Sequence, residues 1–302
     1  MIERTLKFPG PVSPGHTLAP QRRGPHDPCF QIDAEGALWR TSRPPSGPVT
    51  ARISRIAADT VACQAWGSGA EQFVDSLPAL LGIDDDATGF QPDHPTVVAA
   101  AARVPHLRIG RTSRVLEALI PAVLEQRVPG ADAFRSWRML VSRYGTPAPG
   151  PAPAIMRVPP SAEAWRAIPS WEFHRANVDP GRARTLIGCA QRAESLERLV
   201  VRPSVESREA LTCMPGVGVW TAAETAQRAF GDADALSVGD YHVSKMIGWT
   251  LTGRPIDDAA MVELLEPMRP HRYRVVRLLE VSGLAYEPRR GPRLPVQNIS
   301  RL

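Results

Sequence analysis

Lysine is almost absent from this chain of 302 residues. Lys7 and Lys245 are the two lysines among 36 basic Lys and Arg residues, and the other 34 are arginine. A protein that forms a Schiff base with its substrate needs an amine nucleophile, which lysine usually supplies. The composition therefore leaves few residues for that chemistry.

A long apolar run is also missing. No stretch of about 18 apolar residues could form a transmembrane helix, and the proline-containing N-terminal segment lacks the apolar core of a secretion signal. With 43% hydrophobic and 22% charged residues, the chain can bury the core of one large or two ordinary domains. We expect a monomer in the cytoplasm, associated with the nucleoid if the source is prokaryotic.

Paired cysteines are missing as well. Cys29, Cys63, Cys189 and Cys213 lie far apart and form no CxxC pair, which argues against a zinc ribbon or an iron–sulfur loop. We expect them to be buried, reduced thiols. The net charge of +5 and the pI near 9.4 permit a nucleic acid partner without requiring one.

The N-terminal part of the chain has the pattern of a small antiparallel sheet. After an opening that resembles a loop, turn residues separate short runs with strand character. These runs cover residues 29–33, 37–43, 49–56 and 60–66. A short amphipathic helix is expected at 72–81, followed by a polar connector from Asp84 to about Pro95.

From about Thr96 onward the pattern is helical. In residues 113–126 the apolar positions form one stripe, which Pro121 should kink or divide into two shorter helices. Further helices are expected at 134–144, 162–167, 180–193, 204–212, 220–229, 241–251, 258–265 and 272–284. The proline-rich stretch at 147–160 is a linker by composition, although a long loop inside one domain is equally allowed. The tail from Pro288 to Leu302 looks irregular and basic, with Arg289, Arg290, Arg293 and Arg301.

We therefore predict an α+β fold that is mainly α. A small N-terminal antiparallel sheet domain at 1–88 precedes a helical region at 89–302.

The segment from Leu211 to Ala222, with the sequence LTCMPGVGVWTA, is the most informative. It predicts a helix that ends near Thr212, a tight glycine-containing turn, and a second helix that opens at about Val219. Amides at the start of the second helix lie at its positive end, where they suit a DNA phosphate. An ordinary helical hairpin would have the same local pattern.

The context of this segment resembles the 3-methyladenine DNA glycosylase II family of the helix-hairpin-helix DNA glycosylase superfamily. In that family the hairpin ends in Gly-x-Trp-Thr-Ala, as residues 218–222 do, and an aspartate followed by tyrosine comes about 20 residues later. Asp240-Tyr241 matches this, with Asp240 lying 22 residues after Gly218. The Val123-Leu124-Glu125-Gln126 segment looks like the family's helix that carries a glutamine toward the lesion, and Pro270-His271-Arg272 stands where some members have Pro-Trp-Arg.

The resemblance implies a helix-hairpin-helix glycosylase that hydrolyses the N-glycosidic bond of alkylated purines in duplex DNA after flipping the base. A fixed carboxylate stabilises the positive charge that the sugar develops in the transition state. Asp240 is the expected catalytic residue; alone it would equally suit the N-cap of the helix near Tyr241, and the two roles are compatible. Relatives in the superfamily that also cleave the backbone carry lysine at the position of Trp220, so we expect a monofunctional enzyme without a cofactor.

Further site residues follow from the resemblance. The base pocket is expected to contain Trp220, Tyr241, Gln126, His271 and Glu224. The DNA contacts are expected at Pro215, Gly216, Val217, Gly218, Val219, Thr221 and Arg272. The carbonyl groups of Thr212, Met214 and Val217 could bind a monovalent cation.

Several features keep alternatives open. Trp220 could fill the core, His271 could lie on the surface or contact phosphate, and Arg272, Arg274 and Arg277 could form either a phosphate-binding strip or a solvated helix face. Glu224 stands where one branch of the family has a pocket tyrosine, and Trp171-Glu172-Phe173-His174 has no counterpart, so Glu172 and His174 are weaker site candidates. A non-catalytic DNA-binding protein and a glycosylase for another lesion are the rival functions.

Overall fold

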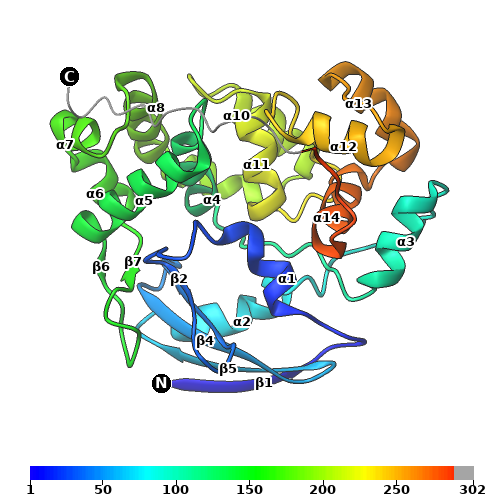
Figure 1. Cartoon of the computed structure of the whole chain (residues 1–302). Coiled ribbons are helices and arrows are strands. Elements are labelled where there is room, and N and C mark those ends of the chain that lie inside the picture. Colours follow the sequence, from blue (N-terminus) through cyan, green and yellow to red (C-terminus); the bar gives the residue numbers. More distant parts are fainter. Residues whose placement is uncertain (289–302) are drawn as a thin grey trace.

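A computed structural model describes residues 1–288 as a small sheet beneath a larger helical body (Figure 1). The sheet contains five antiparallel strands in the order β1-β5-β4-β3-β2. Their bounds are β1 Ile2–Lys7, β2 Phe30–Ile32, β3 Leu38–Ser42, β4 Val49–Ala57 and β5 Thr60–Trp66. The α+β, mainly α fold class is confirmed.

The sheet has a core of its own, built from alternate strand residues and one face of a helix. Val49, Ala51 and Ile53 on β4 are fully or almost fully buried, as are Val61 and Cys63 on β5. Helices α1 (Pro14–Leu18) and α2 (Ala70–Leu80) contribute to the same hydrophobic cluster. The 88/89 domain boundary itself stays a prediction.

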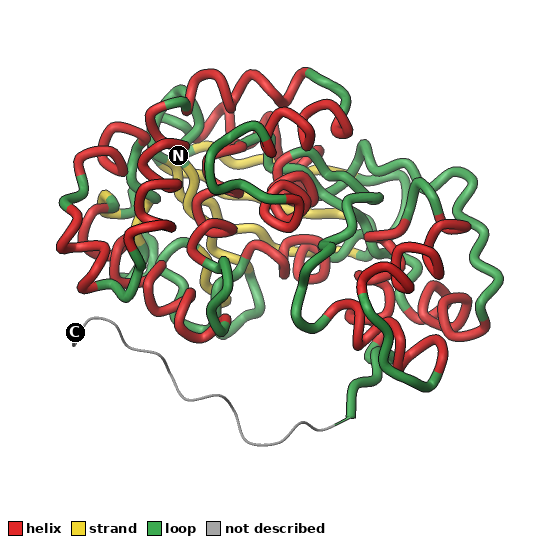
Figure 2. Tube along the Cα trace, turned by 90° about the horizontal axis from the view of Figure 1, so that it is seen from above, coloured by secondary structure: helices red, strands yellow, loops and turns green. Residues whose placement is uncertain are grey.

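The helical body consists of two groups of helices, seen to the left and right above the sheet in Figure 1. The left group contains α4 Val115–Leu124, α5 Gly130–Tyr144, α6 Ala162–Ala167, α7 Ser170–Arg175, α8 Pro180–Gln191, α9 Ala193–Glu197, α10 Ser204–Thr212 and α11 Val219–Ala229. The right group contains α3 Pro95–Arg103, α12 Val243–Thr252, α13 Asp258–Leu265 and α14 Arg272–Ser282. Short 3-10 turns lie at Ala19–Gln21, Arg198–Val201 and Glu266–Met268. Figure 2, seen from above, shows the strands under helices of the left group, with part of the right group extending beyond the sheet.

Helix α4 is the centre of the left group and packs against both α8 and α11. Val115, Leu119, Val123 and Leu124 are buried in its core, as the apolar stripe predicts. Pro121 lies inside one uninterrupted helix, so the alternative of two shorter helices is wrong.

The opening of the chain is not a loop, contrary to expectation. Residues Ile2–Lys7 form edge strand β1, paired with β5 from Ile2 opposite Ala65 to Lys7 opposite Thr60. Helix α1 follows, with Ser13 as its N-cap and Pro14 at its first position. The strand was missed because its partner lies about sixty residues away, and local composition carries no trace of that pairing.

The proline-rich stretch is a partly exposed loop whose last residues pack against the rest of the protein, so the linker interpretation is wrong. It contains a two-stranded ribbon of β6 (Thr146–Pro147) and β7 (Arg157–Val158). The carbonyl oxygen of Arg157 accepts hydrogen bonds from the Cys29 thiol at 3.4 Å and from the Thr41 hydroxyl at 2.6 Å. These contacts hold the loop against the N-terminal sheet.

Two smaller differences concern the cysteines and the tail. Cys29, Cys63 and Cys189 are buried as expected, whereas Cys213 is exposed at the end of α10. The predicted basic tail, with Arg289, Arg290, Arg293 and Arg301, lies outside the described residues. No described helix has the length and apolar character needed to cross a membrane.

Candidate active site

The predicted hairpin forms between α10 and α11. The turn closes through hydrogen bonds from Met214 N–H to the Leu211 carbonyl and from Val217 N–H to the Met214 carbonyl, both at 3.0 Å. Gly216 has a φ of +83°, and a Cβ atom there would lie 2.0 Å from Oγ1 of Thr185 on α8. Glycine is therefore required at this position by both backbone conformation and close packing.

Gly218 differs from Gly216 because it faces open space. It is the N-cap of α11, in an extended conformation, and as a glycine it has no side chain that could cap the helix. A Cβ atom at Gly218 would meet no atom within 4 Å, and the next residue, Val219, is 62% exposed. The first N–H groups of α11 thus lie at an accessible, positively polarised helix end, an arrangement that suits a phosphate.

Gln126 connects the end of α4 to the hairpin. Its side-chain amide donates to the Gly216 carbonyl and to Thr221 Oγ1, both at 2.9 Å. The side chain is half-buried. The structure therefore brings Gln126 to the hairpin; its role in base recognition stays a prediction.

Asp240 is held by hydrogen bonds to both of its carboxylate oxygens. Oδ1 accepts from the N–H groups of His242 at 2.7 Å and Val243 at 3.0 Å, which cap the start of α12. Oδ2 accepts from the indole N–H of Trp220 at 3.0 Å. Asp240 thus makes capping hydrogen bonds at the start of α12, which begins at Val243 rather than Tyr241. Its catalytic role stays a prediction.

Trp220 lies in the first turn of α11 and is half-buried. Its indole links the hairpin to Asp240, across 20 residues of chain. Neighbouring Tyr241 is 61% exposed, and its ring lies under the Lys245 ammonium at 3.9 Å. Trp220, Tyr241 and Asp240 therefore gather at one place beside the hairpin.

Glu224 lies one helical turn after Trp220 and is held on both sides. Its Oε1 accepts from Ser237 Oγ at 2.5 Å, and its Oε2 accepts from Arg228 Nη1 at 2.7 Å. Arg228 also donates to the Pro20 carbonyl at 2.9 Å. Glu224 and Arg228 thus form a partly buried ion pair on α11, which Arg228 ties to the N-terminal segment.

His271 is not brought to this site by any described contact. It is 4% exposed and packs edge-on against Phe90, with ring centroids 5.3 Å apart. Its ring nitrogens face the Thr88 carbonyl at 3.4 Å and Arg274 Nε at 3.3 Å. Because His271 is buried in the right-hand group of helices, the surface position is wrong. The described contacts give no support to the predicted pocket role.

Arg272 and Arg274 are buried, so the alternative of a solvated helix face is wrong for them, whereas the phosphate-binding role predicted for Arg272 stays a prediction. The Arg272 guanidinium is buried and binds both oxygens of Asp234, at 2.9 and 2.7 Å. Arg274 is likewise buried and binds Asp85 at 2.9 and 2.6 Å. Both guanidinium groups are thus paired with carboxylates inside the protein, which gives no support to a phosphate-binding strip.

The unplaced segment Trp171-Glu172-Phe173-His174 lies on α7. Glu172 is buried and forms ion pairs with Arg143 at 3.0 Å and Arg175 at 3.3 Å. Phe173 is fully buried, and His174 is exposed. Glu172 therefore has a structural role that joins α5 to α7.

The carbonyl groups of Thr212, Met214 and Val217 remain candidates for a monovalent cation. The Met214 carbonyl already accepts the Val217 N–H. Among residues 1–288, no group of three His, Cys, Asp or Glu side chains is arranged to hold a metal ion.

Sequence reasoning missed two residues close to this site, Arg23 and Glu125. Nε of Arg23 lies 3.5 Å from Oε1 of Glu125, and Glu125 immediately precedes Gln126. One signal was present in the sequence: a glutamate at the C-terminal end of an apolar helix faces the negative end of the helix dipole. No sequence signal identified Arg23, since its partner lies 102 residues away.

Comparison with solved structures identifies the class of fold. The structure superposes on a 3-methyladenine DNA glycosylase from Archaeoglobus fulgidus with a TM-score of 0.78 and 17% identity, over 93% of this chain and 98% of that one. An 8-oxoguanine glycosylase/lyase from Clostridium acetobutylicum gives a TM-score of 0.73 and 13% identity, over 93% and 96% of the two chains. The fold is that of the helix-hairpin-helix DNA glycosylases.

Sequence comparison identifies more specific relatives. The chain is 32% identical over 234 residues to a protein of Mycobacterium tuberculosis described as a probable bifunctional transcriptional activator/DNA repair enzyme AlkA. The match covers 70% of this chain and 43% of that protein, so the chain spans less than half the length of these curated relatives. No protein-family model matches the chain. Over the matched part, the chain is a homologue of AlkA.

Proposed function

We propose that the chain is a monofunctional DNA glycosylase that removes alkylated purines of the 3-methyladenine type from duplex DNA by hydrolysis, and so initiates base excision repair. The observation that carries this proposal is the hydrogen bond from the Trp220 indole to Asp240 at 3.0 Å. It places a fixed carboxylate and an aromatic ring together beside a helix end that suits a phosphate.

Binding begins at the hairpin. The N–H groups at the start of α11, next to the open face of Gly218, hold a DNA phosphate. The target nucleotide leaves the base stack and turns toward Trp220 and Tyr241. An electron-rich indole favours a base that alkylation has made cationic, through stacking and cation–π attraction.

Asp240 then stabilises the charge that develops on the sugar. As the bond between C1′ and the base nitrogen breaks, positive charge spreads over C1′ and the ring oxygen. A carboxylate that is already held by three donors needs little reorganisation to face that charge. Water adds to C1′, its proton passes to Asp240 or to solvent, and the products are the free base and an abasic site.

The relatives support this substrate class in different degrees. The curated relative is described as a DNA repair enzyme, and the structural neighbours act on 3-methyladenine in one case and on 8-oxoguanine in another. The cationic lesion is favoured here because the Asp240 carboxylate and the Trp220 indole lie together at the site.

A panel of lesion-containing duplexes tests the proposal. Single-turnover release of free base is measured for 7-methylguanine, 3-methyladenine, 8-oxoguanine and uracil. The proposal predicts release of the alkylated purines and little release of uracil or 8-oxoguanine. Release of 8-oxoguanine alone would favour another lesion, and DNA binding without release of any base would favour a binding protein.

A further inference from the structure

Asp240 lies near the end of a segment that contains neither helix nor strand. This segment, residues 230–242, connects α11 to α12. The N–H of Asp240 donates to the Ser237 carbonyl at 3.2 Å, which closes a four-residue turn. A side chain on an irregular segment is placed less precisely than one on a helix, unless other contacts hold the segment. The contacts of this turn therefore determine how well Asp240 is placed.

Side chains of α11 hold the turn at its first residue. The Ser237 hydroxyl donates to Glu224 Oε1 at 2.5 Å and accepts from Gln227 Nε2 at 2.8 Å. The same Gln227 nitrogen donates to the Ala235 carbonyl at 2.8 Å. Ser237 is 5% exposed, so these bonds lie where water competes little with them. The orientation of the hydroxyl is thus fixed by one donor and one acceptor.

The turn is also held at its last residue, again from α11. The indole of Trp220 donates to Asp240 Oδ2 at 3.0 Å. Trp220, Glu224 and Gln227 follow one another at spacings of four and three residues, so they lie on one face of the helix. One face of α11 therefore holds both ends of the turn from Ser237 to Asp240.

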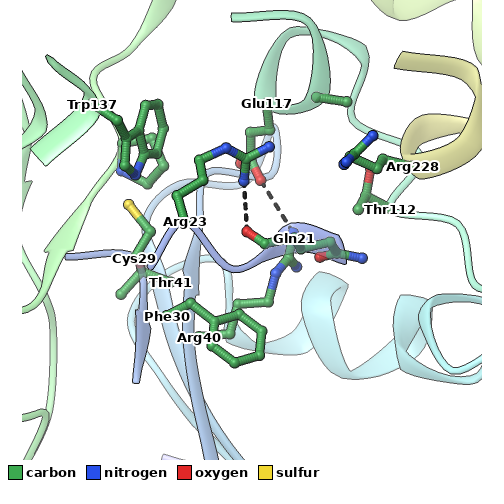
Figure 3. Close-up of a pocket in the computed structure, with 12 residues that line it drawn as sticks. Gln21, Arg23, Cys29, Phe30, Arg40, Thr41, Thr112, Glu117, Trp137 and Arg228 are labelled. Atoms are coloured by element: carbon green, nitrogen blue, oxygen red, sulfur yellow. Dashed lines mark hydrogen bonds and ion pairs between the residues drawn. The ribbon is translucent and has the colours of Figure 1, made fainter. Parts of the chain in front are cut away.

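Glu224 is itself fixed by an arginine. Its Oε2 accepts from Arg228 Nη1 at 2.7 Å, and the two side chains are 12% and 15% exposed. The Arg228 Nε donates to the Pro20 carbonyl at 2.9 Å, and the Arg228 carbonyl accepts from the Thr112 N–H at 2.8 Å. Figure 3 shows Arg228 beside Thr112 at one side of a small cavity of about 30 Å³. The Glu224 carboxylate is therefore tied to parts of the protein outside the site.

We propose that Glu224 and Ser237 are positioning residues that hold Asp240 for catalysis. The inference rests on the proposed function. Glu224 fixes the Ser237 hydroxyl, Ser237 fixes the start of the turn, and the turn sets the direction from which the Asp240 carboxylate meets C1′ of the sugar. A displacement of about 1 Å at a reacting group costs on the order of a hundredfold in rate.

This role differs from the base-pocket role predicted for Glu224. A residue that contacts the base should affect different lesions by different factors when it is replaced. A residue that acts only through Asp240 should slow the release of 3-methyladenine and 7-methylguanine by the same factor, because both bases are cationic and the sugar is the same. Its replacement should also leave the affinity for DNA unchanged.

The first test is Ser237→Ala, which removes the hydroxyl and leaves the backbone of the turn. Single-turnover release of both bases is measured at saturating enzyme, under conditions in which urea unfolding shows each variant to be folded. We expect a loss of about tenfold for both bases. Ser42→Ala is the matched control, because the buried Ser42 hydroxyl also donates to a glutamate, Glu117 at 2.8 Å, but between the sheet and α4. It should leave both rates unchanged.

Glu224→Gln tests whether Glu224 acts through Ser237. The loss of charge weakens the bond from the hydroxyl and should lower both rates by about fivefold. In the Ser237→Ala background that bond is already absent, so the same change should have no further effect. A further loss in that background, or a loss for one base only, would indicate contact with the base and overturn the inference.

A spectroscopic signal gives a measurement that does not depend on activity. The indole N–H of Trp220, assigned in a nitrogen–proton NMR spectrum by its loss in Trp220→Phe, reports on the bond to Asp240. Ser237→Ala and Glu224→Gln should each shift this signal and speed its exchange with water, whereas Ser42→Ala should not. An unchanged signal or an unchanged release rate in Ser237→Ala would overturn the inference. Release of neither base by the wild type would count against the proposed function itself, and the NMR signal would still test the link from Ser237 to Asp240.

Discussion

The carboxylate of Asp240 accepts hydrogen bonds from two different parts of the chain. The N–H groups of His242 and Val243 follow it in the chain, whereas the Trp220 indole comes from the hairpin helix. Hydrogen bonds to a charged group each contribute about 1.5–3 kcal/mol. The carboxylate is therefore oriented before DNA arrives.

Replacing Trp220 by Phe tests the indole bond. The ring stays, while the N–H donor to Asp240 is lost. We expect single-turnover release of 7-methylguanine to fall about tenfold, which corresponds to about 1.4 kcal/mol of barrier.

Trp39→Phe is the matched control for that variant, since the Trp39 indole donates to Asp33 at 3.0 Å within the sheet. It should leave the release rate at the wild-type value. A Trp220→Phe variant as fast as wild type would show that the bond does not matter for catalysis.

Single residues differ in how well the sequence predicted them. The resemblance, through the spacing from a glycine turn, singled out Asp240 and Trp220, and the structure joins these two by a hydrogen bond. The ion pair of Arg272 was not predicted because its partner, Asp234, lies 38 residues earlier in the chain, and only the packing of α14 brings the two together. A charged residue cannot be assigned to DNA or to an internal ion pair from its own neighbourhood.

Among the elements, the hairpin contains two glycines with different requirements. Gly216→Ala should destabilise the protein, because the new Cβ would overlap Thr185 Oγ1 and φ is +83°.

Gly218→Ala should fold normally, because its Cβ points into open space. If a phosphate approaches there, Gly218→Ala will weaken DNA binding at unchanged stability. Urea unfolding and DNA affinity, measured for both variants, check this; normal DNA affinity in Gly218→Ala would contradict the proposed phosphate contact.

A separate prediction about stability concerns Arg272 on helix α14. Arg272→Leu leaves Asp234 without its main partner in a buried position, which should lower the free energy of unfolding by about 3–5 kcal/mol. Exposed Arg166 on α6 serves as the control for removing an arginine. Because Arg272 makes no phosphate contact in this account, the slope of DNA affinity against salt concentration should not change in the folded variant. A reduced slope at unchanged stability would restore the phosphate-binding role.

Most helices were predictable as elements because their apolar stripes and caps are local features. Helices α10 and α13 have the expected bounds, Ser204–Thr212 and Asp258–Leu265. Strand β1 and the ribbon of β6 and β7 were not predictable, since they exist through pairing between distant segments. Proline content alone also could not distinguish a linker from a loop whose carbonyls bind the sheet.

At the scale of the whole molecule, the sheet supports the helices that carry the site. The N-terminal segment reaches the hairpin helix through the bond from Arg228 to the Pro20 carbonyl, and it reaches α4 through Arg23. The sequence predicted that a sheet precedes a helical body. It could not predict these cross-connections, which depend on how the layers pack.

The scarcity of lysine in the whole chain predicts the type of product. With two lysines, and with tryptophan at the position where lyases of the superfamily carry the nucleophile, no Schiff base should form. Borohydride treatment during turnover should therefore trap no covalent adduct with DNA, and strands should break only after alkali. An adduct that disappears in Lys245→Ala would contradict this and identify Lys245 as the nucleophile.

Release of alkylated base by the wild type and by Asp240→Asn, compared in single turnovers with saturating enzyme, tests the central claim most directly. The variant keeps the size of the side chain and loses its charge. The account predicts release by the wild type and a loss of at least about a hundredfold in the variant, or about 2.7 kcal/mol of barrier, at similar DNA affinity. Equal rates in the two proteins would contradict the assignment of Asp240 as the catalytic carboxylate.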